Sequence, residues 1–180
     1  MKSAAEFGRQ LALNNVRLVY GGGSVGLMGS VALSVLEHGG SVTGIIPEFL
    51  MKRENAIENS QELIVTRDMH ERKRLMFERS DAFVALPGGV GTLEEVVEQL
   101  TWQQLGRHSK PILFANVKNF WDPMLRLIDH MRSTGFIRPS IPVEILKAER
   151  VEDILPNLQA AAARMSGEDT ELAGDVAGRL

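Results

Sequence analysis

Residues 17–29 read RLVYGGGSVGLMG, a short run of large apolar side chains that passes directly into three glycines. The run 17–20 predicts a buried strand, because a short β-rich segment closed by glycine is typical of one. Residues 26–38 carry apolar side chains at helical spacing and end at Gly39-Gly40, which predicts a helix with a glycine stop. A strand, a glycine turn and a helix in direct succession are the beginning of a βαβ unit.

The same alternation continues along the chain. Further strands are predicted at 41–46, 62–66, 81–86, 111–115 and 141–146, and helices at 69–79, 92–105, 122–133 and 151–165. A (β/α)₈ barrel needs about 250 residues, and the chain has 180. We therefore expect an α/β fold of one domain over residues 1–165, built as a Rossmann-like doubly wound parallel sheet with helices on both faces. Residues 166–180 read as a polar tail.

Composition excludes several classes of protein. The formal net charge is −3 and shows no basic stripe, so a nucleic-acid-binding surface is not expected. The chain has no cysteine, which excludes a disulfide scaffold and a thiolate zinc site. No apolar run approaches the ~20 residues of a membrane helix, and the first residues read as a helix rather than a signal peptide. We expect a cytoplasmic protein that does not contact a membrane.

The first glycine turn, Gly21–Gly23, is a candidate anion-binding site. Glycine lets a ligand approach the backbone, and the N–H groups that begin the following helix favour an anion. The segment is not a Walker A loop, since no Gly-Lys-Ser/Thr follows it. Gly21, Gly23 and Gly26 fit the dinucleotide pattern Gly-x-Gly-x-x-Gly, which alone is a weak signal. A tight βα turn without a ligand is the alternative interpretation.

The second glycine turn, Pro87-Gly88-Gly89-Val90-Gly91-Thr92, also follows a predicted strand and precedes a predicted helix. Thr92 could cap that helix, with Glu95 three residues later as in a capping box, which would be a structural explanation for Glu95. Two such turns in one small sheet are more easily explained by a ligand. Because both follow strands, we expect them at the carboxyl edge of the sheet, where α/β sheets bind ligands.

The third candidate segment, 68–76, is a charged helix with Met69, Leu75 and Met76 on its apolar side. A charge run of this kind is most often a solvated helix face. Arg72 and Lys73 are about 100° apart around a helix, so we expect one of the two to face a ligand. Arginine would hold a phosphate with two hydrogen bonds, and lysine would contribute a point charge.

These segments together resemble the Lonely Guy (LOG) family, the cytokinin riboside 5'-monophosphate phosphoribohydrolases. The resemblance rests on Gly21-Gly22-Gly23-Ser24 with Gly26-Leu27-Met28-Gly29, on Met69-His70-Glu71-Arg72-Lys73, and on Pro87-Gly88-Gly89-x-Gly91-Thr92-x-x-Glu95. Residues 100–106, LTWQQLG, also resemble the family, and the match extends from about residue 5 to 137. The older label "lysine decarboxylase" finds no support, because no pyridoxal-phosphate arrangement is recognisable.

The resemblance implies an enzyme that hydrolyses the N-glycosidic bond of a cytokinin-like or AMP-like nucleoside 5'-monophosphate, with free base and ribose 5-phosphate as products. It implies Arg72 and Glu95 as the catalytic pair. The substrate-contacting positions that it implies are Gly22, Gly23, Glu54, Lys73, Gly88, Gly89, Val90, Gly91, Thr92, Leu93, Glu94 and Thr101. A carboxylate such as Glu95 suits a reaction in which the sugar becomes oxocarbenium-like.

No metal or cofactor is expected for this chemistry, and the four histidines show no ligand spacing. The resemblance implies a homodimer. It also implies a strand ahead of the first helix that this sequence does not include, so we expect the neighbouring strands to be left without a partner. The alternative function is that of a non-catalytic nucleotide or molybdenum-cofactor carrier, which needs the two turns but not Arg72 and Glu95.

Overall fold

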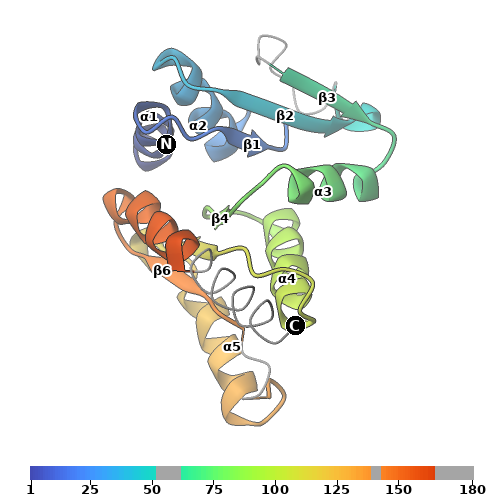
Figure 1. Cartoon of the computed structure of the whole chain (residues 1–180), viewed down its shortest axis with the longest axis vertical. Coiled ribbons are helices and arrows are strands. Elements are labelled where there is room, and N and C mark those ends of the chain that lie inside the picture. Colours follow the sequence, from blue (N-terminus) through green and yellow to red (C-terminus); the bar gives the residue numbers. More distant parts are fainter. Residues whose placement is uncertain (52–61, 139–142, 165–180) are drawn as a thin grey trace, which may run out of the picture. The chain divides into compact units, whose positions relative to one another are not determined.

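The computed structural model describes residues 1–51, 62–138 and 143–164. The chain divides into two compact units, Met1–Ser80 and Asp81–Leu180, and each unit contains one three-stranded sheet (Figure 1). Every described strand pair is parallel. The predicted α/β class with parallel strands and covering helices is therefore confirmed, with the strands divided between two sheets.

The first unit alternates helices and strands from its beginning. Its elements are α1 (Lys2–Leu13), β1 (Leu18–Tyr20), α2 (Gly26–Glu37), β2 (Val42–Pro47), η1 (Glu48–Leu50), β3 (Glu62–Thr66) and α3 (Met69–Glu78). The strand order is β1-β2-β3, with Tyr20 opposite Gly44 and Pro47 opposite Thr66. All six residues of β2 are buried, as expected for the central strand of a covered parallel sheet.

Helices α1 and α2 pack against each other. Their buried apolar side chains include Phe7 and Leu11 on α1 and Val31 and Val35 on α2. The hydroxyl of Ser34 donates a hydrogen bond of 2.6 Å to the carbonyl oxygen of Ala5, which joins the two helices. The pair forms one layer of the first unit.

Hydrogen bonds hold both ends of helix α3, and the bond at its end connects it to β3. At its start, the Asp68 carboxylate accepts a 2.8 Å hydrogen bond from the Glu71 backbone N–H. At its end, Arg79 donates a 2.8 Å hydrogen bond to Glu62, the first residue of β3. The second oxygen of Glu62 accepts a 2.9 Å hydrogen bond from Thr43 of β2. Helix α3 therefore runs back along the sheet in a defined position.

The second unit repeats the alternation. Its elements are β4 (Phe83–Ala85), α4 (Val90–Gln104), β5 (Ile112–Ala115), η2 (Val117–Asn119), α5 (Asp122–Ser133), β6 (Leu146–Ala148) and η3 (Val151–Asp153). Helical residues 154–164, here called the closing helix, complete the described part. The strand order is β4-β5-β6, with Phe83 opposite Ile112 and Leu113 opposite Leu146.

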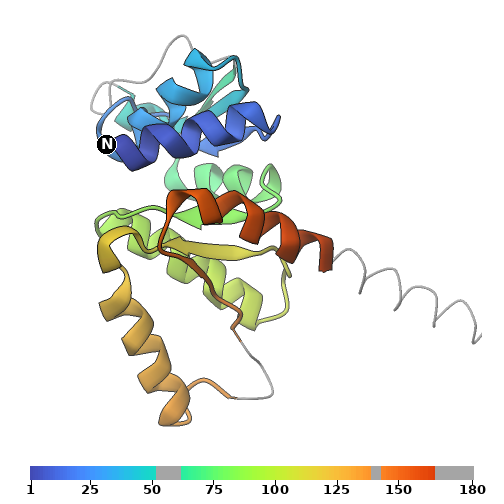
Figure 2. The same ribbon diagram turned by 90° about the vertical axis from the view of Figure 1, so that its left-hand side faces the viewer.

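Both faces of the second sheet are covered. Ile112 and Phe114 of β5 belong to a buried cluster with residues of α4 and α5. Side chains alternate along a strand, so Leu113 and Ala115 point to the opposite face, and both are fully buried. Figure 2 shows the closing helix, in red, on one side of this sheet and α4 on the other.

The sequence places most elements within one or two residues of their observed bounds. The last strand is an exception, since it is predicted at 141–146 and is found at Leu146–Ala148. Val143, from the apolar run that suggested the strand, instead packs into the cluster with α4 and α5. The last helix, predicted at 151–165, is found as η3 followed by the closing helix, while the predicted tail, 166–180, lies outside the described residues.

Candidate functional site

The first glycine turn follows β1 directly and leads into α2. Gly22 has a φ of +82°, a backbone conformation that favours glycine strongly. Gly21, Gly22 and Gly23 are all buried. Helix α2 begins without a side-chain cap and has no acidic residue in its first turn. Among the described residues, its N-cap therefore supplies no side-chain acceptor and its first turn no carboxylate, which favours an added anion.

Helix α3 shows how the same chain caps a helix with its own side chains. Asp68 caps α3, and Glu71 lies in the first turn. The hydrogen bond from the Glu71 backbone N–H is the main cause that holds the pKa of Asp68 below its ordinary value. The pKa of Glu71 is lowered as well, mainly by the hydrogen bond from the Arg67 backbone N–H. The beginning of α3 is therefore satisfied internally, unlike that of α2.

The guanidinium group of Arg72 lies against the first glycine turn. A Cβ atom on Gly21 would overlap Nη2 of Arg72, and it would lie 3.1 Å from Sδ of Met28. On its other side, Nη1 of Arg72 is 3.7 Å from Sδ of Met69, one turn earlier on α3. Glycine at position 21 thus leaves room for the arginine side chain, and a larger residue would have to displace its guanidinium group.

The charged side chains of helix α3 differ in their surroundings. Arg72 of the Arg72–Lys73 pair lies against the first turn, and which of the two faces a ligand stays a prediction. Lys73 is half-buried on the same helix, and His70 is exposed.

The second glycine turn begins α4 earlier than the sequence suggests. The N-cap is Gly89, and the Leu93 backbone N–H donates a 3.0 Å hydrogen bond to the Gly89 carbonyl. Thr92 therefore lies inside the first turn, and the predicted capping box of Thr92 and Glu95 is wrong. Helix α4 also lacks a side-chain cap and an acidic residue in its first turn. A capping box therefore does not explain the presence of Glu95, whose side chain is half-buried.

The glycines of the second turn serve two different purposes. A Cβ atom on Gly88 would overlap the hydroxyl of Thr92, so the turn folds tightly onto the beginning of α4. In contrast, a Cβ atom on Gly89 or Gly91 would have no heavy atom within 4 Å, and neither residue has a positive φ. The packing of the described residues does not require glycine at these two positions. Open glycines at the beginning of a helix are suited to a ligand that approaches the backbone closely.

The other residues implied by the resemblance are spread over α4 and beyond. Val90 is 82% exposed, and Leu93 and Glu94 are also exposed. The hydroxyl of Thr101 donates a 2.8 Å hydrogen bond to the Val97 carbonyl of its own helix. Glu54 lies outside the described residues.

Sequence reasoning missed Gly21 and Tyr20 as parts of this region. Gly21 stands in the quoted motif, but only the structure shows that it accommodates Arg72. Tyr20, the last residue of β1, is 6% exposed, and its hydroxyl has no hydrogen-bond partner in the described part of the chain. Burial raises the pKa of Tyr20 to about 12, so this hydroxyl stays protonated. The place of Tyr20 directly before the turn was the available signal.

The two turns belong to different units, the first with Arg72 to Met1–Ser80 and the second with Glu95 to Asp81–Leu180. That they lie together at one edge stays a prediction. Among residues 1–51, 62–138 and 143–164, no group of three or more acidic, histidine or cysteine side chains is placed to hold a metal. In the same ranges, no helix has the length and apolar character of a membrane span.

The sequence matches known proteins over most of its length. The family model described as "Possible lysine decarboxylase" matches residues 28–158. A probable cytokinin riboside 5'-monophosphate phosphoribohydrolase of rice (Oryza sativa subsp. japonica), LOGL1, is 43% identical over 177 residues, which are 94% of this chain and 79% of the rice protein. The cytokinin riboside 5'-monophosphate phosphoribohydrolase LOG1 of Arabidopsis thaliana is 43% identical over 173 residues, 92% of this chain and 81% of LOG1.

Solved structures share the fold. The molybdenum cofactor carrier protein of Chlamydomonas reinhardtii matches with a TM-score of 0.64 and 21% identity, over 90% of this chain and 87% of the carrier. The molybdenum cofactor binding protein of Rippkaea orientalis matches with a TM-score of 0.65 and 22% identity, over 88% of this chain and 85% of that protein. At such identities the likeness extends to the Rossmann-like fold and not to the ligand, so it does not favour the carrier function.

The contact between Gly21 and Arg72 predicts an energetic coupling. We expect Gly21→Ala to lower the free energy of unfolding by about 1–3 kcal/mol, because the added methyl group displaces the guanidinium. In an Arg72→Ala background the same substitution should cost clearly less, since the space is then empty. Urea unfolding of the four proteins measures this coupling. Equal costs in both backgrounds would show that the two residues do not compete for this space.

Proposed function

Because the chain belongs to the LOG family, we propose that it is a hydrolase acting on the N-glycosidic bond of cytokinin-like or AMP-like nucleoside 5'-monophosphates. The products are the free base and ribose 5-phosphate. The relatives from rice and Arabidopsis carry this activity in their names and align with nearly the whole chain. The enzyme class is therefore that of hydrolases of N-glycosyl bonds, and decarboxylation of lysine is not proposed.

The observation that carries the proposal is the uncapped beginning of α2 and of α4. Each helix follows a glycine turn, lacks a side-chain cap and has no acidic residue in its first turn. Such a helix end binds phosphate through its free N–H groups and its dipole. A nucleoside monophosphate offers one phosphate and a set of ribose hydroxyls. We assign the contacts to Gly22 and Gly23 at the first turn and to residues 88–94 at the second.

Arg72 is proposed to anchor the nucleotide and to stabilise the departing base. Its guanidinium is fixed against the backbone of Gly21 and beside Met69. A fixed cation is effective because it does not have to reorganise as negative charge develops. Lys73 on the same helix, Thr101 on α4 and Glu54 complete the proposed substrate contacts.

Glu95 is proposed as the carboxylate of the chemical step. The bond between C1' of ribose and the base nitrogen breaks, and its electron pair leaves with the base. C1' becomes oxocarbenium-like, which a nearby carboxylate stabilises electrostatically. The same carboxylate takes a proton from the attacking water, whose oxygen forms the new bond to C1'. The proton that Glu95 takes from the water is then passed to the nitrogen of the departing base, which regenerates the carboxylate, so charge and atoms balance without a cofactor.

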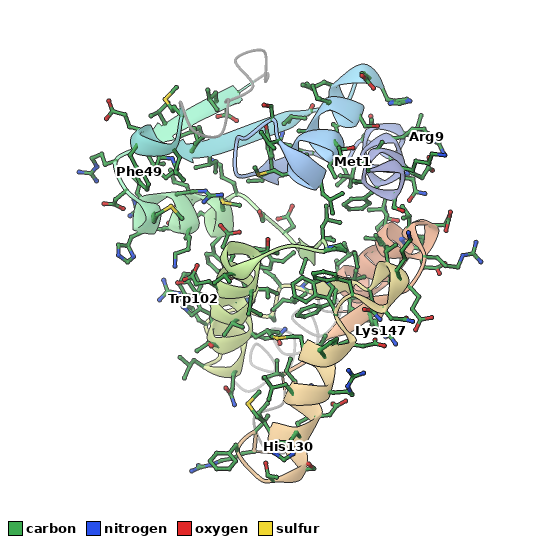
Figure 3. The ribbon with its side chains drawn as sticks, turned by 180° about the vertical axis from the view of Figure 1, so that it is seen from behind. Met1, Arg9, Phe49, Trp102, His130 and Lys147 are labelled. Carbon is green, nitrogen blue, oxygen red and sulfur yellow. The ribbon has the colours of Figure 1, made fainter. Side chains whose placement is uncertain are left out.

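A homodimer is proposed from the outward side of α4. Val90, Val97 and Leu105 are 82%, 42% and 76% exposed and recur at about seven-residue steps, so they share one face. Trp102, labelled in Figure 3, lies under the guanidinium of Arg107, with Cζ 4.9 Å from the ring centroid.

Sedimentation equilibrium of the wild-type protein should give twice the chain mass, and Val97→Glu should shift the measured mass toward that of the monomer. A wild-type mass of one chain would disprove the dimer.

Substitution of Glu95 tests the reaction. With AMP and isopentenyladenosine 5'-monophosphate side by side, the wild-type protein should release the free base and ribose 5-phosphate. We expect Glu95→Gln to lower kcat at least about 100-fold while nucleotide binding stays measurable, because the amide neither stabilises the cation nor accepts the proton. Glu78→Gln, at the exposed end of α3, is the control. Unchanged turnover in Glu95→Gln would remove this residue from the mechanism, and absence of product in the wild type would reject the hydrolase.

Substitution of Gly91 tests the proposed nucleotide contact independently of the catalytic step. Gly91→Ala should raise the free energy of unfolding by about 0.5–1 kcal/mol, because alanine is the better helix former and meets no neighbour. The same methyl group should raise KM for AMP at least about tenfold, since it stands where the nucleotide approaches the backbone. Gln104→Ala, at the other end of α4, should leave KM unchanged. A Gly91→Ala protein with wild-type KM would place the nucleotide elsewhere.

A further inference from the structure

The second unit contains a cavity that the proposed reaction does not use. Its volume is about 260 Å³. The floor is apolar and is made by Pro111, Ile112, Leu146 and Ala161. Pro111, Ile112 and Ala161 are buried, so the floor is part of the packed sheet and closing helix rather than a surface crease. Its size is slightly below that of pockets for drug-sized ligands, which favours a smaller molecule.

The cavity lies at the opposite end of the strands from the second glycine turn. Ile112 and Leu146 are the first residues of β5 and β6, so they lie at the amino edge of this parallel sheet. The turn that begins with Gly88 follows the last residue of β4 and lies at the carboxyl edge. A molecule in the cavity would therefore be separated from residues 88–94 by the length of the strands.

Opposite charges line the cavity without neutralising each other. The carboxylate of Glu144, just before β6, and the guanidinium of Arg164, on the closing helix, both contribute to the lining. Within the described ranges, neither charged group takes part in an ion pair or a hydrogen bond. The remaining polar lining is Ser109 and Gln103, whose side-chain oxygen accepts a 3.0 Å hydrogen bond from the Glu144 backbone N–H. That bond fixes the backbone from which the Glu144 carboxylate extends.

We propose that this cavity binds a small zwitterion, an aliphatic α-amino acid. Glu144 receives the ammonium group and Arg164 receives the carboxylate, each forming a charge-assisted hydrogen bond. The aliphatic side chain of the bound amino acid packs on the apolar floor at Ile112 and Leu146. A phosphate group does not fit the described lining, since Arg164 is the one cation among those residues and the Glu144 carboxylate lines the same cavity.

The bound amino acid would bridge the segment before β6 and the end of the closing helix. Glu144 precedes β6, and Arg164 lies near the end of the described closing helix. A ligand that pairs with both would hold the end of the closing helix against the sheet. Binding to the folded state alone raises thermal stability, which gives a readout that does not depend on catalysis.

Calorimetry and thermal unfolding of the full chain with L-leucine test the site. We expect a Kd of about 1 mM and a rise in Tm. 3-Methylbutylamine, which lacks the carboxylate, and 4-methylpentanoate, which lacks the ammonium group, should each bind about three- to fivefold more weakly, because the charges are at an exposed rim. The Glu144→Gln protein should bind leucine only as well as the wild type binds 4-methylpentanoate. The Arg164→Gln protein should bind leucine only as well as the wild type binds 3-methylbutylamine.

The controls separate this site from the nucleotide site. Glu37→Gln and Arg126→Gln, both exposed and remote in sequence from the cavity lining, should bind leucine like the wild type. Saturating AMP should leave the leucine affinity unchanged, since the glycine turn is at the other edge. Absence of leucine binding, equal affinities for the three probes, or competition by AMP would each overturn the proposal. A failure of the hydrolase assay would leave this result unaffected.

Discussion

The first backbone N–H groups of an α-helix have no acceptor within the helix, and every protein has to satisfy them in some way. Helix α3 satisfies them with Asp68, which stands at its N-cap. Helices α2 and α4 begin after glycine turns and have no such side chain. Glycine leaves the approach to these groups open, so a ligand has room to supply the acceptor. The position of Arg72 against Gly21, and the freedom of Glu95 from a capping role, both follow from these two turns.

Local pattern predicts the elements of this fold well where a short apolar run is bounded by glycine or proline. Strand β3 and helix α5 are found at the residues that the sequence indicates, and α5 has Pro123 near its first turn. The beginning of α4 is different, since Gly-Val-Gly reads as a continued turn. Contact of the Thr92 side chain with Gly88 accompanies a helix that starts at Val90, and that contact is not visible in the sequence. The last strand shifts for a similar reason, because Val143 is used in the core.

For the candidate site, the sequence indicates residue types and motifs but not which of two neighbours is used. The sequence alone does not show which of Arg72 and Lys73 approaches the first turn, and in the structure it is Arg72. The sequence also cannot distinguish a glycine that packing requires, as at Gly88, from one that packing leaves open, as at Gly91. That distinction depends on how the folded turn places neighbouring side chains, such as Thr92 beside Gly88, and on whether a ligand approaches the backbone. The pairing of Arg72 with Glu95 joins residues of the two units and stays a prediction.

The anchoring of α3 at both ends has a consequence for the local dynamics of the helix. Asp68 caps the beginning of the helix, and the hydrogen bond from Arg79 to Glu62 connects its end to the first residue of β3. Fraying from either end has to break one of these bonds first. The amides of α3 and β3 should therefore exchange with solvent deuterium as one cooperative unit, with Arg72 in the middle of it. The arginine would then keep its orientation through the small openings that loosen ordinary surface helices.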